Sequence, residues 1–211
     1  TDDELKRLFD GARTYRKRGP LVNEPICIRY ILMITYMLGL RISETLSIKI
    51  KDIDLEKMYV HIHCSKFYKS RLVTFNEQVS KLMQEILQWR STQMYPMVED
   101  AYVFINLKGK PVNFVSLHQI FTTIRKNAGL YFPDRGRHQP RIHDLRHTFA
   151  VNVLTNWYKS GKNVQDLLPK LSTYLGHLNV SFTSVYLTQT PTLLQEANKS
   201  FYAYKNTNNE E

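Results

Sequence analysis

The apolar run over residues 26–40 is the feature that most restricts how this chain can fold. It is interrupted by Arg29 and is too short to span a bilayer, which takes about 20 consecutive apolar residues. Pro25 is acceptable in the first turn of a helix, Gly39 can end one, and Asn23 can cap its start. The run therefore predicts a helix from Asn23 to about Gly39 in a globular protein with no membrane span.

The rest of the pattern predicts a mainly α chain with a small three-stranded antiparallel sheet. A capping box of Thr1 and Glu4 predicts a first helix. Residues 58–63 alternate and residues 69–75 are rich in strand formers, which predicts a hairpin, and residues 102–105 are expected to add a third strand. Further helices are expected after a cap at Ser43, at 81–90, at 113–127, and from 143 onward with breaks near Gly161, Gly176 and Pro191.

The length of 211 residues suits one domain with its own core. We expect residues 1–204 to form that domain and the polar residues 205–211 to be a disordered tail. The two cysteines, Cys27 and Cys64, are too few for a disulfide framework or a four-cysteine zinc site. Their number fits a reducing, cytosolic setting.

The chain is strongly basic. Its 29 Lys and Arg residues stand against 19 Asp and Glu residues, which gives a net charge of +10 and a pI of about 9.5. Such an excess indicates a polyanionic partner, most often nucleic acid. A basic but merely solvated surface would give the same charge, so the motifs have to decide between the two.

Two short motifs place cations after the apolar helix and in the predicted hairpin. In GLRISE, Arg41 is followed three residues later by Glu44. In CSKFYKSRLV, Lys66 lies in the predicted turn, and Lys69 and Arg71 lie on the strand after it. Taken singly, each motif also has an ordinary interpretation: a loop arginine paired with its neighbouring carboxylate, and a solvated hairpin tip.

The motif HDLRHTF begins at His143 and places Arg146 three residues later, on the same face if a helix starts here. His147 follows His143 by four residues, which is also the spacing of two zinc ligands on a helix. The glutamate base of that zinc motif is missing, and an arginine beside a metal ion is unfavourable, so we expect no metal site. A phosphate clamp and an ordinary polar helix face both remain possible from these residues alone.

Two motifs near the end of the chain carry a histidine and a tyrosine. LGH is expected to end a helix at Gly176, and His177 follows it. VYLTQTP contains Tyr186, nine residues after that histidine. Taken singly, LGH is also typical of a glycine that ends a helix with a cation nearby. Tyr186 could likewise be a tyrosine that serves only in side-chain packing.

Together, the order and spacing of these motifs resemble the tyrosine recombinase (phage integrase) family, in which a phenolic nucleophile attacks a DNA phosphodiester. The resemblance extends over roughly residues 4–201. It implies the catalytic-domain fold of that family, double-stranded DNA as the partner, and chemistry without ATP, metal or other cofactor. It also implies that His143 and Arg146 belong to a phosphate clamp.

The resemblance gives roles to the residues that match the family's motifs. Arg41 and Arg146 match the two catalytic arginines, and His177 matches a third donor to the phosphate. Glu44 matches the acidic residue that supports the hydrogen bonds of the active site. Tyr186 matches the nucleophile, which forms a 3′-phosphotyrosyl intermediate that a 5′ hydroxyl of another strand can reverse.

Two further residues are expected to transfer protons during the reaction. Lys66 matches the hairpin lysine that protonates the leaving 5′ oxygen, and Lys69 is the alternative. A phenol has a pKa of about 10 and is mostly protonated at neutral pH, so its proton has to be accepted during attack. We expect His143 to accept it.

The resemblance also implies an assembly and a setting. Homotetramers on DNA are expected, and the N-terminal core-binding domain is absent from this sequence. A helix predicted over residues 192–204 either packs on its own domain or docks on a neighbouring subunit, and the resemblance favours docking. The extra length over residues 157–162 is more like members carried by transposons, and the expected location is the bacterial cytosol, at the nucleoid. The side chains expected to contact DNA are Arg16, Lys17, Arg18, Lys69, Arg71, Arg135, Arg137 and Arg141.

Two other functions share part of this pattern. A type IB topoisomerase-like enzyme uses the same tyrosine chemistry but rejoins the same strand, and it is disfavoured because a predicted helix follows Tyr186 closely. A DNA-binding module that has lost catalysis is disfavoured because every catalytic position is filled.

Overall fold

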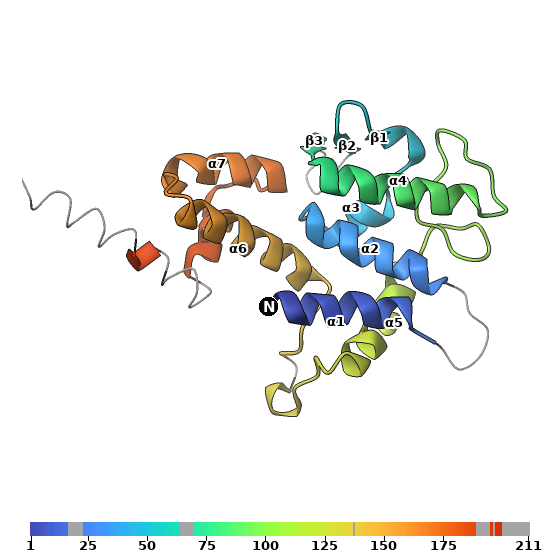
Figure 1. The fold of residues 1–211 in the computed structure, drawn as a ribbon, viewed down its shortest axis with the longest axis horizontal. Helices are drawn as coiled ribbons and strands as arrows, with labels where there is room; N and C mark the ends of the chain where they lie inside the picture. The colour runs from blue at the N-terminus through green and yellow to red at the C-terminus, as the bar shows by residue number, and fades with distance from the viewer. Residues whose placement is uncertain (17–22, 64–69, 137, 189–194, 196, 200–211) are drawn as a thin grey trace, which may run out of the picture. The chain divides into compact units, whose positions relative to one another are not determined.

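The computed structural model describes residues 1–16, 23–63, 70–136, 138–188, 195 and 197–199. The chain divides into two compact units: unit 1 is Thr1–Arg146, and unit 2 begins at His147. The division falls inside helix α6 (His143–Lys159), which Figure 1 draws as one continuous helix. The first turn of α6 therefore belongs to unit 1 and the remainder to unit 2.

Helix α2 is the centre of unit 1, as the apolar run predicts. Its side chains are buried on several sides, and it packs against α1, α3 and α4, while α5 packs against α1 and α3. Figure 1 shows α1 and α2 side by side. The helices of unit 1 before α6 are α1 (Asp2–Arg13), α2 (Pro25–Met37), α3 (Ile42–Leu46), α4 (Glu77–Ser91) and α5 (Phe114–Asn127), with the 3-10 turns η1 (Ile50–Asp52) and η2 (Pro133–Arg135).

The first two helices differ in how they begin. The capping box predicted for α1 is confirmed, because the hydroxyl of Thr1 accepts the backbone N–H of Glu4 and the Glu4 carboxylate accepts from the Thr1 amino group. The predicted cap of α2 at Asn23 is wrong. The Asn23 side chain is buried and donates to the Ser116 hydroxyl at 3.3 Å, so Glu24 takes the capping position instead.

The sheet contains the predicted hairpin but a different third strand. Strands β2 (Tyr59–Ile62) and β3 (Arg71–Thr74) pair antiparallel, and β1 (Ile53–Asp54) pairs with the other edge of β2. The prediction of a strand at 102–105 is wrong, since this segment forms only isolated bridges. Three successive side chains, Val103 to Ile105, are buried there, which is not the alternation of a strand with one face in the core.

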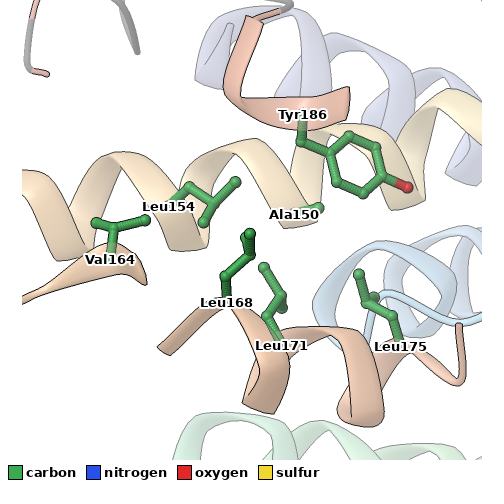
Figure 2. Close-up of a cluster of buried hydrophobic side chains, with 7 residues drawn as sticks. All are labelled: Ala150, Leu154, Val164, Leu168, Leu171, Leu175 and Tyr186. Atoms are coloured by element: carbon green, nitrogen blue, oxygen red, sulfur yellow. The ribbon is translucent and has the colours of Figure 1, made fainter. Parts of the chain in front are cut away.

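Unit 2 is a small helical unit around one apolar cluster. It contains the rest of α6, then α7 (Val164–Leu175), α8 (Ser181–Ser184) and the 3-10 turn η3 (Val185–Thr188). The predicted breaks at Gly161 and Gly176 are confirmed, both with positive φ, and Pro191 lies outside the described residues. The cluster consists of Ala150, Leu154, Val164, Leu168, Leu171, Leu175 and Tyr186, with the tyrosine ring beside Ala150 (Figure 2).

Among the described residues, none of the helices combines the length and the apolar character needed to cross a membrane.

The apolar cluster should determine the stability of unit 2. Leu171→Ala removes a side chain that is 3% exposed, and we expect it to lower the free energy of unfolding by about 2–5 kcal/mol through lost burial and a residual cavity. Leu178→Ala makes the same chemical change at a side chain that is 50% exposed and should cost less than about 0.5 kcal/mol. Urea unfolding of both variants checks this, and equal costs would show that the cluster does not stabilise the unit.

Candidate active site

A buried carboxylate organises the first group of predicted site residues. Glu44 is the third residue of α3, and its Oε2 accepts the backbone N–H of Arg41 at 2.9 Å. Arg41 occupies the N-cap position, so the predicted cap at Ser43 is wrong, since Ser43 lies inside α3. The same carboxylate therefore fixes both the start of the helix and the backbone of the predicted catalytic arginine.

Two guanidinium groups donate to this carboxylate. Arg41 Nη1 donates to Glu44 Oε1 at 2.9 Å. Arg71, on β3, donates through Nη1 to Oε1 and through Nη2 to Oε2, both at 2.9 Å. This two-point arrangement is the geometry in which an arginine binds a carboxylate most strongly. Arg71 thereby links the sheet to the loop that carries Arg41.

A third guanidinium group lies close by within unit 1. Arg146 is 1% exposed, its Nη1 donates to the carbonyl of Gly39 at 2.9 Å, and the same nitrogen lies 3.9 Å from Glu44 Oε2. Three positive charges thus surround one negative charge: Arg41, Arg71 and Arg146 against Glu44. Such an excess of positive charge, held in place by the fold, favours binding of an anion.

The protonation of Glu44 reflects these partners. Burial by itself would raise the pKa of this carboxyl, but hydrogen bonds and positive charge from Arg71, together with the hydrogen bonds from Arg41, outweigh burial and hold the pKa at about 2. The group is therefore ionised at neutral pH and keeps the arginines oriented.

His143 and Arg146 do lie on one helix, one turn apart. His143 is the first residue of α6 and is exposed, whereas Arg146 is buried. Asp144 accepts a hydrogen bond from the backbone N–H of Arg141 at 2.9 Å and pairs with the Arg141 guanidinium at 3.1 Å. Both contacts stabilise the N-terminus of the helix. His143 is thus on the surface of unit 1 at a helix N-terminus.

The second group of predicted residues lies in unit 2. Gly176 ends α7 in the left-handed conformation, with φ 68° and ψ 44°, and His177 follows directly. The imidazole Nδ1 of His177 lies 2.7 Å from the hydroxyl of Thr183, and its ring faces the ring of Tyr186 with centroids 6.2 Å apart. The Tyr186 ring also receives the ring of His147 edge-on at 5.1 Å.

Tyr186 is therefore both a predicted nucleophile and part of a core. Its side chain is 3% exposed, contacts the imidazoles of His147 and His177, and belongs to the apolar cluster. Packing of this kind limits the rotamers that the ring can adopt, so the position of the phenol oxygen is set by the fold of unit 2.

The predicted DNA contacts have different surroundings. Arg16 and Arg135 are exposed, and Arg141 is exposed but paired with Asp144. Arg71 was predicted to contact DNA, but its side chain is 11% exposed and bound to Glu44. The hairpin lysine Lys66 and the predicted contacts Lys17, Arg18, Lys69 and Arg137 lie outside the described residues.

Three contacts of the site were missed by the sequence reasoning. Arg71 has Glu44 as its partner 27 residues away, Thr183 contacts His177, and His147 packs on Tyr186. His147 does carry a sequence signal, because it is one helical turn after His143. Among the described residues, no group of three or more His, Cys, Asp or Glu side chains is placed to hold a metal ion.

Comparison with known proteins gives a consistent result. A family model described as the phage integrase family matches residues 1–192. The putative integrase/recombinase y4rB of Sinorhizobium fredii is 36% identical over 162 residues, which are 75% of this chain and 50% of that protein. The tyrosine recombinase XerC of Lactobacillus delbrueckii subsp. bulgaricus is 33% identical over 159 residues, 75% of this chain and 49% of that protein. The chain thus spans about half the length of these curated relatives.

Solved structures confirm the fold class. The XerH site-specific recombinase bound to a palindromic difH substrate, in a post-cleavage complex, is 26% identical with a TM-score of 0.67, over 94% of this chain and 51% of that one. The XerA recombinase is 23% identical with a TM-score of 0.70, over 95% of this chain and 62% of that one.

The ion cluster around Glu44 should give stability with a defined pH dependence. Because the folded-state pKa of about 2 is below the ordinary 4.5, the stabilisation is fully present above pH 4.5 and is lost as pH falls toward 2. Glu44→Gln should lower the free energy of unfolding by about 3 kcal/mol at pH 7 and by much less near pH 2. Urea unfolding over this pH range measures the effect.

The control is Glu56→Gln, which makes the same change at an exposed glutamate and should alter stability little at any pH. A cost at Glu44 that stays constant from pH 7 to pH 2 would contradict the ion-pair account.

Proposed function

This chain belongs to the phage integrase family, and we propose on that basis that it is the catalytic part of a site-specific DNA recombinase or integrase. The observation that carries the proposal is the arrangement around Glu44, where Arg41 and Arg146 are fixed before any substrate arrives. Arginine stays charged and presents a planar set of donors, which suits the oxygens of a phosphodiester.

The proposed reaction is a transfer of the phosphoryl group to tyrosine. The phenol oxygen of Tyr186 attacks the phosphorus of one DNA strand, a 3′-phosphotyrosyl bond forms, and the bond to the 5′ oxygen breaks. His143 accepts the phenol proton, and Lys66, or Lys69 in its place, protonates the leaving 5′ oxygen. The new bond conserves the energy of the broken one, so a 5′ hydroxyl of another strand can reverse the step without ATP.

The cations of the site would act on the charge that develops during attack. Arg41, Arg146 and His177 donate to the non-bridging oxygens, and Glu44 keeps the arginines oriented. Preorganised donors of this kind are typically worth about 3–4 kcal/mol each, because they need not reorganise when the transition state forms. Such donors would stabilise the negative charge that a metal ion stabilises in other phosphoryl-transfer enzymes.

Double-stranded DNA is the proposed partner. The net charge of +10 supports it, and XerH, to which the chain is similar, is bound to its difH substrate in the solved structure. The relative y4rB is named a putative integrase/recombinase. We further propose that the chain acts as a homotetramer on DNA in the bacterial cytosol and serves a mobile element. The helix predicted at 192–204, through which subunits would dock, lies largely outside the described residues.

Tyr186→Phe should abolish covalent attachment to DNA and leave DNA affinity within about threefold, since only the nucleophilic oxygen is removed and the ring keeps its packing. The measurement is an SDS-resistant adduct on a nicked duplex, with affinity from fluorescence anisotropy. Tyr158→Phe is the matched control, a partly buried tyrosine of the same unit, and should form the adduct normally. An adduct that persists in Tyr186→Phe contradicts the assignment.

Arg41→Ala should lower the cleavage rate by about 10²–10³-fold and change affinity by less than about threefold, because its contribution is greatest in the transition state. Arg135→Ala, at an exposed arginine, should weaken affinity and leave the rate of the bound complex unchanged. Single-turnover cleavage and binding titrations separate the two effects. Proportional losses of rate and affinity in Arg41→Ala would mark it as a simple phosphate contact.

Recombination itself requires a further test. Incubation with two differently labelled duplexes should produce hybrid products if strands are exchanged, whereas a topoisomerase-like enzyme would return only the original pairs.

A further inference from the structure

We propose that Thr183 is a positioning residue that holds the His177 imidazole in the orientation and tautomer needed to donate from Nε2 to the scissile phosphate. The inference rests on the role proposed above for His177. It starts from the 2.7 Å contact between the Thr183 hydroxyl and His177 Nδ1, which the reaction itself does not require.

The backbone of His177 is fixed by the end of α7. Gly176 adopts a left-handed conformation, and the N–H of His177 donates to the carbonyl of Ser172 at 3.0 Å. This bond joins the residue after the glycine to the last turn of the helix, as in a Schellman cap. The backbone leaves the χ angles of the imidazole undetermined, so a side-chain contact has to set them.

Thr183 is well placed to do so. It is fully buried in α8, and its own backbone N–H donates to the carbonyl of Val180 at 2.8 Å. A buried hydroxyl on a fixed backbone has few alternative partners, and leaving it without one is costly. Its contact with Nδ1 therefore fixes which ring edge of His177 points into unit 2.

The chemistry of a hydroxyl suits this position better than a carboxylate. A neutral imidazole carries one N–H, and the other nitrogen is an acceptor. When the Thr183 hydroxyl donates to Nδ1, the hydrogen of the ring is on Nε2. When His177 is protonated, the hydroxyl can rotate and accept from Nδ1–H, and Nε2 still carries hydrogen. The proposal assigns the donating role to the hydroxyl in the neutral state, and Nε2 is then a donor in both charge states.

Two substitutions separate the hydroxyl from the shape of the side chain. Thr183→Val keeps the volume and removes the hydroxyl, whereas Thr183→Ser keeps the hydroxyl and removes a methyl group. We expect adduct formation at pH 8 to fall roughly tenfold in Thr183→Val and to stay within about threefold of wild type in Thr183→Ser. Thr155→Val, at another buried threonine of unit 2, controls for the loss of a buried hydroxyl as such and should retain wild-type adduct formation.

Comparison of the two variants distinguishes positioning from general damage to the fold. An equal deficit in Thr183→Ser and Thr183→Val would overturn the proposal, because the two share only a change in side-chain shape and differ in the hydroxyl.

The deciding measurement is independent of activity. In the ¹⁵N-histidine spectrum of the full chain, assigned with His177→Gln, His177 should be a single Nε2–H tautomer at pH 8 and should become a mixture in Thr183→Val. An Nδ1–H tautomer in the wild type overturns the inference even if Thr183→Val fails to fold. If the Nε2–H tautomer of His177 depends on Thr183 but the protein forms no adduct with DNA, the positioning role of Thr183 is supported and the proposed function is refuted.

Discussion

Hydrogen bonds to the ionised carboxylate of Glu44 hold together the part of unit 1 that carries the predicted site. The carboxylate accepts hydrogen bonds from the backbone N–H of Arg41 and from both Nη atoms of Arg71, and it lies 3.9 Å from Arg146 Nη1. Each arginine comes from a different element: the start of α3, strand β3 and the first turn of α6. Because a single negative charge opposes three positive ones, the same interaction that joins these elements also leaves a cationic centre suited to a phosphate.

Unit 2 combines packing and chemistry in a similar way. Tyr186 belongs to the apolar cluster that joins α6 and α7, so the residue proposed to attack DNA is also a core residue. His177 is fixed by the glycine cap of α7 on its backbone and by Thr183 on its ring. The placement of Tyr186 and His177 is therefore the result of side-chain packing and an ordinary helix cap, and changes in those features should alter the proposed chemistry.

Local features of this structure could be predicted from the sequence, and distant pairings could not. The apolar run gives α2, and the alternation around the hairpin gives β2 and β3, because both patterns depend on residues close in the chain. The third strand of the sheet is not the predicted segment 102–105, because tertiary packing determines which segment forms a short edge strand. Strand alternation does not reveal that Arg71 binds a carboxylate 27 residues away, and no local pattern in the sequence indicates the contact between Thr183 and His177.

The proposed function requires that Tyr186 form a covalent bond with DNA. The most direct measurement is to trap the wild-type chain on a nicked suicide duplex, digest the adduct, and identify the modified peptide by mass spectrometry. We predict that the nucleotide-bearing residue is Tyr186, attached through a 3′ phosphate. Attachment at any other residue, or tight DNA binding without an adduct, would contradict the account.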